Sequence, residues 1–281
     1  MLRMATAVIA TAEDETSPSS TPGYLAWTRG GTDGPVIVMK LGVVLLRRDG
    51  GRAIRVSPSH ALAASGGMDS RWLVIQLVRA GQSDLELIDL RDRKRRDLPA
   101  PVNTRAWEWR GSISGPWLLF GRLGAPAGTY KVVLYNVASH QVRVLDAVAG
   151  HGAYAEPGQL NGRYAVWAGC PANFCTIYRY DIRTRKRLRI TTDYGHVLFA
   201  PSVASNGDVY YGRGRRSCGS EVKLMRYRPG SGSTVVRSLP AGYDFRFTNT
   251  TQIGARQRIL FDGGRCPRGF DVFAVEDKPT S

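Results

Sequence analysis

A short apolar segment recurs six times in this chain at near-constant spacing, and this repeat restricts the folds that the chain can adopt. Each copy has the composition of a β-strand, as in YLAW, WLVI or VYYG. The copies begin at Tyr24, Trp72, Trp117, Tyr164, Val209 and Ile259, so successive starts are 48, 45, 47, 45 and 50 residues apart. A unit of this length needs its neighbours to bury both faces of its sheet, which predicts one domain built from packed repeats.

The unit from Tyr154 to Thr191 shows the internal layout most clearly, because it contains four strand-like segments separated by turn residues. Asn161-Gly162 joins the first two segments, and Asn206-Gly207 has the same place in the next unit. Asn-Gly is a strong hairpin signal, since a type I′ turn requires positive φ at both central residues. Four strands in each of six units predict an all-β fold, a six-bladed β-propeller of four-stranded antiparallel blades.

The repeats set the expected domain boundaries: an N-terminal tail over 1–23, the propeller over 24–277 and a C-terminal tail over 278–281. The last unit ends after its third strand, so its outer strand must come from elsewhere. The segment TAVIA (6–10) is a candidate for this ring-closing strand.

The same tail also has features of a secretory signal. An apolar run follows Arg3 and ends in Ala10-Thr11-Ala12, which resembles an A-x-A cleavage site. Both interpretations stay open at this point. Cleavage would leave only residues near Ser17–Pro22 to close the ring.

Four cysteines indicate where the protein is located. Cys170, Cys218 and Cys266 are 48 residues apart, and Cys175 follows Cys170 by five. We favour a Cys170–Cys175 disulfide within one loop and a Cys218–Cys266 disulfide between neighbouring blades. The alternatives are free thiols in a cytosolic protein, or a zinc site with all four sulfurs about 2.3 Å from one ion. Disulfides would place the protein in an oxidising compartment.

Two segments resemble the PD40, or WD40-like, repeats of TolB-type six-bladed propellers. They are SNGDVYYG…VKLMRYRPG (205–230) and LNGRYAVW…TIYRYDIRTRKRLRIT (160–191). The repeats of that family have Pro-Asp before the glycine, which every unit here lacks. The resemblance implies a bacterial cell-envelope or secreted propeller that binds other proteins or glycans, usually without catalysis.

The charge balance is strongly basic, with 39 Lys and Arg against 23 Asp and Glu, a net charge of +16. Such an excess attracts anionic partners, although arginine-rich composition from GC-rich coding would produce it as well. Nucleic acid is not expected, because the basic stretches are not interleaved with aromatic residues. No stretch approaches the roughly 18 apolar residues of a membrane-spanning helix. The chain also lacks the common nucleophile, zinc-protease and nucleotide-binding motifs, so we expect no metal and no cofactor.

The repeat register does single out a set of candidate ligand-binding residues. Each connection between blades delivers the chain to the mouth of the central channel, about 12 or 13 residues before a copy of the apolar strand. Cationic residues or histidines occupy this place in five units, and an aromatic residue accompanies the last: His60, Arg105, His151, His196 and Arg246, with Tyr243. Arginine binds carboxylates bidentately and aromatic rings stack on sugar faces, although polar residues are expected at the channel mouth of any propeller.

We therefore expect a monomeric, non-enzymatic binding or scaffold propeller that recognises a protein or an anionic glycan, carboxylate or phosphate at its funnel face. The alternative is a lyase or hydrolase acting on an acidic glycan or ester. His151 or His196 would then be the general base, with Asp244 orienting a histidine. An enzyme should show a histidine with a carboxylate partner within about 3 Å inside a deep pocket.

Overall fold

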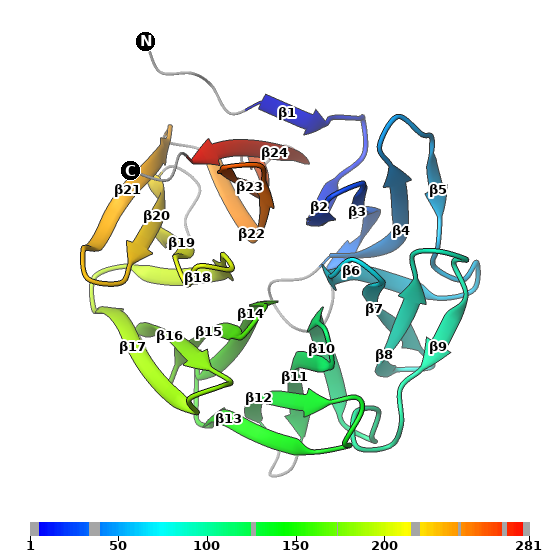
Figure 1. Ribbon diagram of the computed structural model, residues 1–281, viewed down its shortest axis with the longest axis horizontal. Helices are drawn as coiled ribbons and strands as arrows, with labels where there is room; N and C mark the ends of the chain where they lie inside the picture. The colour runs from blue at the N-terminus through cyan, green and yellow to red at the C-terminus, as the bar shows by residue number, and fades with distance from the viewer. Residues whose placement is uncertain are drawn as a thin grey trace.

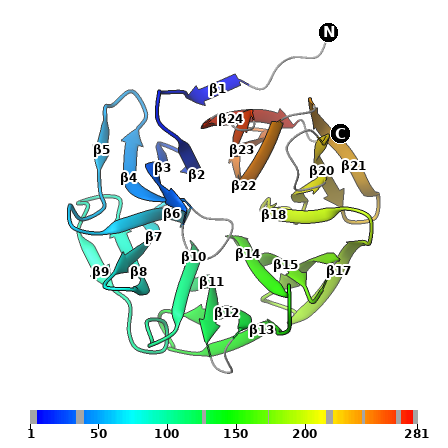
Figure 2. The ribbon, with the colours of Figure 1, turned by 180° about the vertical axis from the view of Figure 1, so that it is seen from behind.

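The computed structural model describes residues 6–33, 40–124, 128–172, 174–214, 220–240, 243–265 and 269–277. Within these ranges every regular secondary-structure element is a β-strand. The described residues contain no helix that is long and apolar enough to cross a membrane. The strands form sheets arranged around a central axis, and the chain passes once round the ring (Figure 1). Seen from behind, the ring again brings β1 alongside β24 (Figure 2). The protein is thus an all-β propeller.

Three sheets each use four consecutive antiparallel strands, ordered from the inside of the ring outward. The first contains β10 (Trp107–Ser114), β11 (Trp117–Gly124), β12 (Thr129–Asn136) and β13 (Val142–Val148). The second contains β14 (Tyr154–Asn161), β15 (Tyr164–Cys170), β16 (Cys175–Asp181) and β17 (Lys186–Asp193). The third contains β18 (Val197–Val203), β19 (Val209–Gly214), β20 (Val222–Arg228) and β21 (Gly232–Leu239). This four-stranded layout confirms the strand order that the repeat predicted.

The hairpin between β14 and β15 differs from the predicted one in its turn residues. Its two central residues are Gly162 and Arg163, and of these only Gly162 has positive φ, at 56°. Positive φ at the first central residue alone fits a type II′ turn rather than type I′. Asn161 instead ends β14, and its Nδ2 donates to Val203 O on the neighbouring sheet at 3.1 Å. The asparagine therefore joins two sheets.

The last sheet closes the ring. Its inner strand is β22 (Tyr243–Ile253), followed by β23 (Arg256–Arg265) and β24 (Phe270–Asp277). The outermost strand is β1 (Thr6–Ile9), which pairs antiparallel with β24 and places Ile9 opposite Val272. The first strand of the chain and the last one therefore lie in the same sheet.

The remaining strands belong to one hydrogen-bonded sheet with two similar parts. One part contains β2 (Glu15–Thr21), β3 (Tyr24–Asp33), β4 (Lys40–Arg48) and β5 (Ala53–Arg55). The other contains β6 (Leu62–Met68), β7 (Trp72–Arg79), β8 (Gln82–Asp89) and β9 (Arg95–Asp97). A single residue pair, Gly42 with Ala63, joins the two parts. β2 is an inner strand although it lies within the segment 1–23.

The core lies between adjacent sheets rather than within them. In one cluster, Leu119 and Leu134 of one sheet pack with Leu160 and Trp167 of the next, and all four are at most 2 % exposed. Each sheet thus buries both faces against its neighbours, as the repeat required.

In two of the sheets, a glycine on the second strand lies directly against an aromatic ring on the inner strand. A Cβ atom at Gly121 would lie 2.4 Å from the Trp109 ring, and one at Gly212 would lie 2.4 Å from the Phe199 ring. Both pairs join an inner strand to the second strand of its sheet. Glycine is needed there because any side chain would displace the ring.

The cluster beneath β1 allows ring closure to be tested. Ile9 is 8 % exposed and packs with Trp27 and Leu45 of β3 and β4 and with Leu260 and Val272 of the last sheet. We expect Ile9→Ala to lower the free energy of unfolding by about 2–4 kcal/mol, because the lost methylene groups leave a cavity at the junction. Chemical denaturation monitored by tryptophan fluorescence measures this change.

The control is Val144→Ala on the outer strand β13, where Val144 is 52 % exposed. It should change the free energy of unfolding by no more than about 0.5 kcal/mol. Equal effects of the two substitutions would contradict a role for β1 in holding the ring together.

Candidate functional site

All six candidate residues lie at one end of the ring. We define the funnel face as the end at which each inner strand begins. Because consecutive strands are antiparallel, the loops between the second and third strands of each sheet lie at this same end. The funnel face therefore combines the connections between sheets with the loop 170–175 and its equivalents.

Side chains from the inner strands fill the central channel. The Arg110 guanidinium pairs with Glu156 and donates at 3.2 Å to the backbone oxygen of Arg246. Gln159 accepts from Thr250 N at 2.9 Å and donates to Thr250 O at 2.8 Å. The cavity that the inner strands line has a volume of only about 50 Å³. Since ligand pockets usually measure about 300–1,000 Å³, we look for the site on the funnel face rather than in the channel.

Three of the candidate residues lie on separate connections and are exposed: His60, Arg105 and His151. His60 borders an open depression of about 720 Å³ together with Glu13 and Arg29. His151 lies in the turn before β14. These three residues are distributed around the rim.

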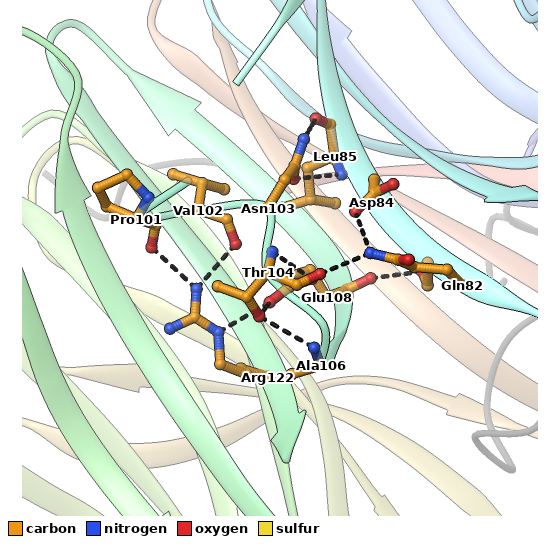
Figure 3. Close-up of polar contacts among 11 residues, drawn as sticks. Gln82, Asp84, Leu85, Pro101, Val102, Asn103, Thr104, Ala106, Glu108 and Arg122 are labelled. Atoms are coloured by element: carbon orange, nitrogen blue, oxygen red, sulfur yellow. Dashed lines mark hydrogen bonds and ion pairs between the residues drawn. The ribbon is translucent and has the colours of Figure 1, made fainter. Parts of the chain in front are cut away.

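A dense polar network holds the connection that carries Arg105 (Figure 3). Glu108, which is fully buried, accepts from Thr104 Oγ1 at 2.6 Å and from Arg122 Nε at 2.8 Å. Arg122 also donates to the backbone oxygens of Pro101 and Val102 at 2.9 and 2.8 Å. Burial raises the pKa of the Glu108 carboxyl, and the bonds from Thr104 and Arg122 partly oppose that shift. The network fixes the backbone on both sides of Arg105.

The remaining part of this connection is fixed from the preceding sheet. Asn103 exchanges two hydrogen bonds of 2.9 Å with the backbone of Leu85, and Gln82 Nε2 donates to Thr104 O at 2.6 Å. Arg105 is therefore presented on a preorganised loop.

Arg246 and Tyr243 both belong to the inner strand β22. The Arg246 guanidinium lies 4.7 Å from the centre of the Phe270 ring, and its backbone N donates to the buried Asp262 at 2.9 Å. Tyr243 is 36 % exposed at the start of the strand. Nothing is described for the side chain of Asp244.

His196 has the most developed surroundings of the six. Its Nδ1 lies 3.2 Å from Asp193 Oδ2 and 3.2 Å from Arg213 Nη2, while Arg213 Nε donates to Asp193 Oδ2 at 2.7 Å. The same carboxylate accepts from the N–H groups of Gly195 and His196 at 2.9 and 3.1 Å. Burial alone would raise the pKa of Asp193, but these bonds outweigh it and hold the pKa at about 2.

An aromatic pair adjoins this cluster. Tyr194 is 78 % exposed, and its ring centre lies 5.0 Å from that of Phe174. Phe174 belongs to the loop 170–175, which the Cys170–Cys175 disulfide closes. The favoured pairing of these two cysteines is therefore present, and neither of them is a thiolate zinc ligand. Cys218 and Cys266 lie outside the described residues.

The 3.2 Å between His196 and Asp193 is close to the separation of about 3 Å expected of an enzyme, but the pair does not lie in a deep pocket. The histidine side chain is 38 % exposed, and Arg213 donates toward the same ring nitrogen that faces the carboxylate. Among the residues that the structure describes, no group of three His, Cys, Asp or Glu side chains is placed to hold a metal ion. The cluster therefore consists of a guanidinium and an imidazole held beside one carboxylate on an open rim.

Sequence reasoning missed Arg213 and Asp193, which complete the His196 cluster, and the channel pair Arg110–Glu156. Asp193 had a detectable signal, because Asp-x-Gly-His before a strand is a sequence in which the carboxylate can cap the following N–H groups. Arg213 had none, since it is 17 residues from His196 and is brought there by the pairing of β18 with β19.

The comparisons with known proteins support the fold. The sequence matches no family model, and a search of curated proteins finds no match. The structure is similar to TolB from Acinetobacter baumannii, with a TM-score of 0.56 and 15 % identity over 84 % of this chain and 60 % of that chain. The putative TolB from Agrobacterium tumefaciens gives a TM-score of 0.60 and 15 % identity over 96 % of this chain and 92 % of that chain.

A third similar structure is the β-propeller domain of the Trilobed protease from Pyrococcus furiosus, which has an open velcro topology. Its TM-score is 0.53, with 10 % identity over 96 % of this chain and 99 % of that chain. At such low identity these likenesses establish a β-propeller resembling those of TolB and of peptidases. The PD40 character of the repeats stays an expectation.

The depressed pKa of Asp193 can be tested directly. In a carbon-detected NMR titration, we expect the Asp193 carboxyl to titrate at a pH of about 2, against an ordinary value of 3.8. Because the folded-state pKa is lowered, the contribution of this carboxylate to stability is full above pH 3.8 and is lost as the pH falls toward 2.

In Arg213→Gln the midpoint should rise toward the ordinary value, because the main hydrogen-bond donor is gone. Arg105→Gln, on a different connection, should leave it unchanged. A midpoint near 3.8 in the unaltered protein would show that the cluster does not form.

Proposed function

We propose that this protein is a six-bladed propeller that acts as a non-enzymatic binding protein, with the funnel face as its recognition surface for a protein or an anionic ligand. The blade number is supported by the channel cavity, which six inner strands line through Ser17, Gly66, Arg110, Gly158, Pro201 and Thr248. The single Gly42–Ala63 pair supports dividing the eight-stranded sheet into two blades.

The Asp193–His196–Arg213 cluster is the observation that carries the binding proposal. The Asp193 carboxylate accepts hydrogen bonds from the N–H groups of Gly195 and His196 and from Arg213 Nε. It therefore holds Arg213 and His196 in place. Both cationic or donor side chains remain about one-third exposed, at 35 and 38 %. A fixed pair of donors at an open rim suits a carboxylate, phosphate or acidic sugar.

The other candidate residues would extend this surface around the rim. Arg105 on its fixed loop and Arg246 above Phe270 add positive charge on the same face, and His60, His151 and Tyr243 add polar and aromatic contacts. The net charge of +16 would increase the association rate with an anionic partner and make it dependent on salt.

A hydrolase or lyase that uses His196 as general base is the second candidate, because the Asp193 carboxylate lies 3.2 Å from the ring. The two proposals differ in the expected effect of His196→Ala. An enzyme would lose turnover of an acidic glycan or ester, whereas a binding protein would lose affinity alone.

The binding proposal is tested with a panel of immobilised polyanions: oligogalacturonate, polyphosphate and polyglutamate, with a neutral glucan as reference. We expect salt-dependent binding to at least one polyanion, measured by biolayer interferometry, and at least tenfold weaker binding by Arg213→Gln because a charged hydrogen-bond donor is lost.

Arg93→Gln is the charge-matched control, since Arg93 is exposed in the turn between β8 and β9 at the opposite end of the ring. If both variants weaken binding equally, the attraction is a general effect of net charge. That result, or no binding to any polyanion, would overturn the proposal of an anionic ligand.

We also propose that the protein is exported to the cell envelope or secreted, as the Cys170–Cys175 disulfide supports. Mass spectrometry of the protein from its native compartment, after thiol alkylation without reduction, should find Cys170 and Cys175 unlabelled. Reduction before alkylation should label both. Labelling of these cysteines without reduction would contradict export, and the same spectra report the mature N-terminus.

A further inference from the structure

We infer that Phe174, Tyr194, His196 and Arg213 form a subsite for the ring of a carboxylated sugar, such as a uronic acid within an acidic glycan. This inference rests on the proposed function and specifies its ligand. Tyr194 would stack on the sugar face, while Arg213 and His196 would bind the carboxylate.

The exposure of Tyr194 is the first reason. At 78 %, it is the most exposed of the large apolar or aromatic side chains that the structure describes. Its ring is nevertheless supported, because the Phe174 ring contacts it with the ring centres 5.0 Å apart and an interplanar angle of 47°. A supported aromatic ring that faces solvent provides a flat apolar surface, which the C–H face of a sugar matches.

The hydrogen-bonding state of the two donors is the second reason. Among the described residues, Arg213 Nη1 and His196 Nε2 make no hydrogen bond, whereas Arg213 Nε and Nη2 are engaged. His196 Nδ1 faces both Arg213 Nη2 and the Asp193 carboxylate. Nε2 carries the proton when Nδ1 accepts from Arg213, and it also carries one in the imidazolium form, in which Nδ1 donates to Asp193. In these two forms both unused nitrogens carry N–H groups, and a carboxylate ligand that accepts from both selects them.

The third reason is that the loop carrying Phe174 and the segment carrying Tyr194 and His196 are both held in place before a ligand binds. The Cys170–Cys175 disulfide closes the loop of Phe174, and Tyr154 Oη lies 3.3 Å from Cys175 Sγ. Asp193 caps the backbone of the segment 193–196, which carries Tyr194 and His196. Since little ordering remains for binding, a single sugar ring could gain measurable affinity here.

These features favour a sugar over an acidic peptide. A peptide carboxylate would use the two donors and leave the ring of Tyr194 without a partner. A uronic acid carries its carboxylate directly on the ring, so one residue of the glycan presents a stacking face and an anion together. Binding of this one ligand should therefore depend on both Tyr194 and Arg213.

The experiment measures the affinity of the full chain for tetragalacturonate by titration calorimetry, with cellotetraose as a neutral control and tetraglutamate as a peptide control. We expect binding of tetragalacturonate alone. Tyr194→Ala should weaken it about tenfold or more, since the stacking surface is lost, and Tyr194→Phe should bind like the unaltered protein. Because Tyr194 is exposed, its removal should leave the thermal unfolding temperature unchanged.

Ile253→Ala is the control, because Ile253 is an exposed apolar residue at the end of β22 opposite the funnel face, and it should not change the affinity. If tetragalacturonate binds but Tyr194→Ala does not weaken it more than Ile253→Ala, the subsite is wrong while the proposed function stands. If tetraglutamate binds instead, with dependence on Arg213 but not on Tyr194, the sugar assignment is overturned and anion binding stands. If no anion binds, both proposals fail.

Discussion

Hydrogen bonds between the inner strands of neighbouring blades hold the ring in register. These strands diverge too much to form a continuous ladder, yet their buried backbone groups need partners. Small polar side chains supply them, as where Ser112 on β10 accepts from Leu160 N on β14 at 2.9 Å. Asn249 accepts from Ser20 N at 3.1 Å across the ring closure. The position of every loop on the funnel face follows from this inner ring.

The same requirement explains why the binding surface lies on the rim. Arg110 reaches from one inner strand to Glu156 on the next and to the backbone of Arg246, and Gln159 reaches Thr250. Breaking a buried ion pair of this kind leaves a charge without compensation, which commonly costs about 3–5 kcal/mol. The side chains inside the channel therefore stabilise the fold. The connections between sheets can change in sequence without disturbing these contacts.

The sequence predicted the outer three strands of each blade better than the inner one. Strands such as Tyr164–Cys170 show apolar residues in a regular repeat, because both of their faces are buried. The inner strand Glu15–Thr21 reads ETSPSST and resembles a turn, yet five of its residues are buried. The residues of this strand make hydrogen bonds to the neighbouring blade. Apolar periodicity therefore does not identify the strand in the sequence.

The candidate site was predictable to a similar extent. The repeat register located the connections and with them His196, but the partners of His196 depend on pairing between strands that are distant in sequence. Asn161 shows the opposite case, in which a clear turn signal marked the right hairpin while the side chain was used to join two blades.

A carboxylate–arginine pair recurs in several blades, and it explains part of the His196 cluster. In two blades, an acidic residue on the inner strand pairs with an arginine directly opposite: Glu15 with Arg29 and Glu108 with Arg122, both at 2.8 Å. Leu198 occupies the equivalent place opposite Arg213, so the carboxylate comes instead from Asp193 on the connection. Pairing of Arg213 with a carboxylate is thus a structural feature of the fold. This pairing accounts for neither the ring of His196 beside that pair nor the exposed Tyr194, and it is these two side chains that distinguish this blade as a recognition surface.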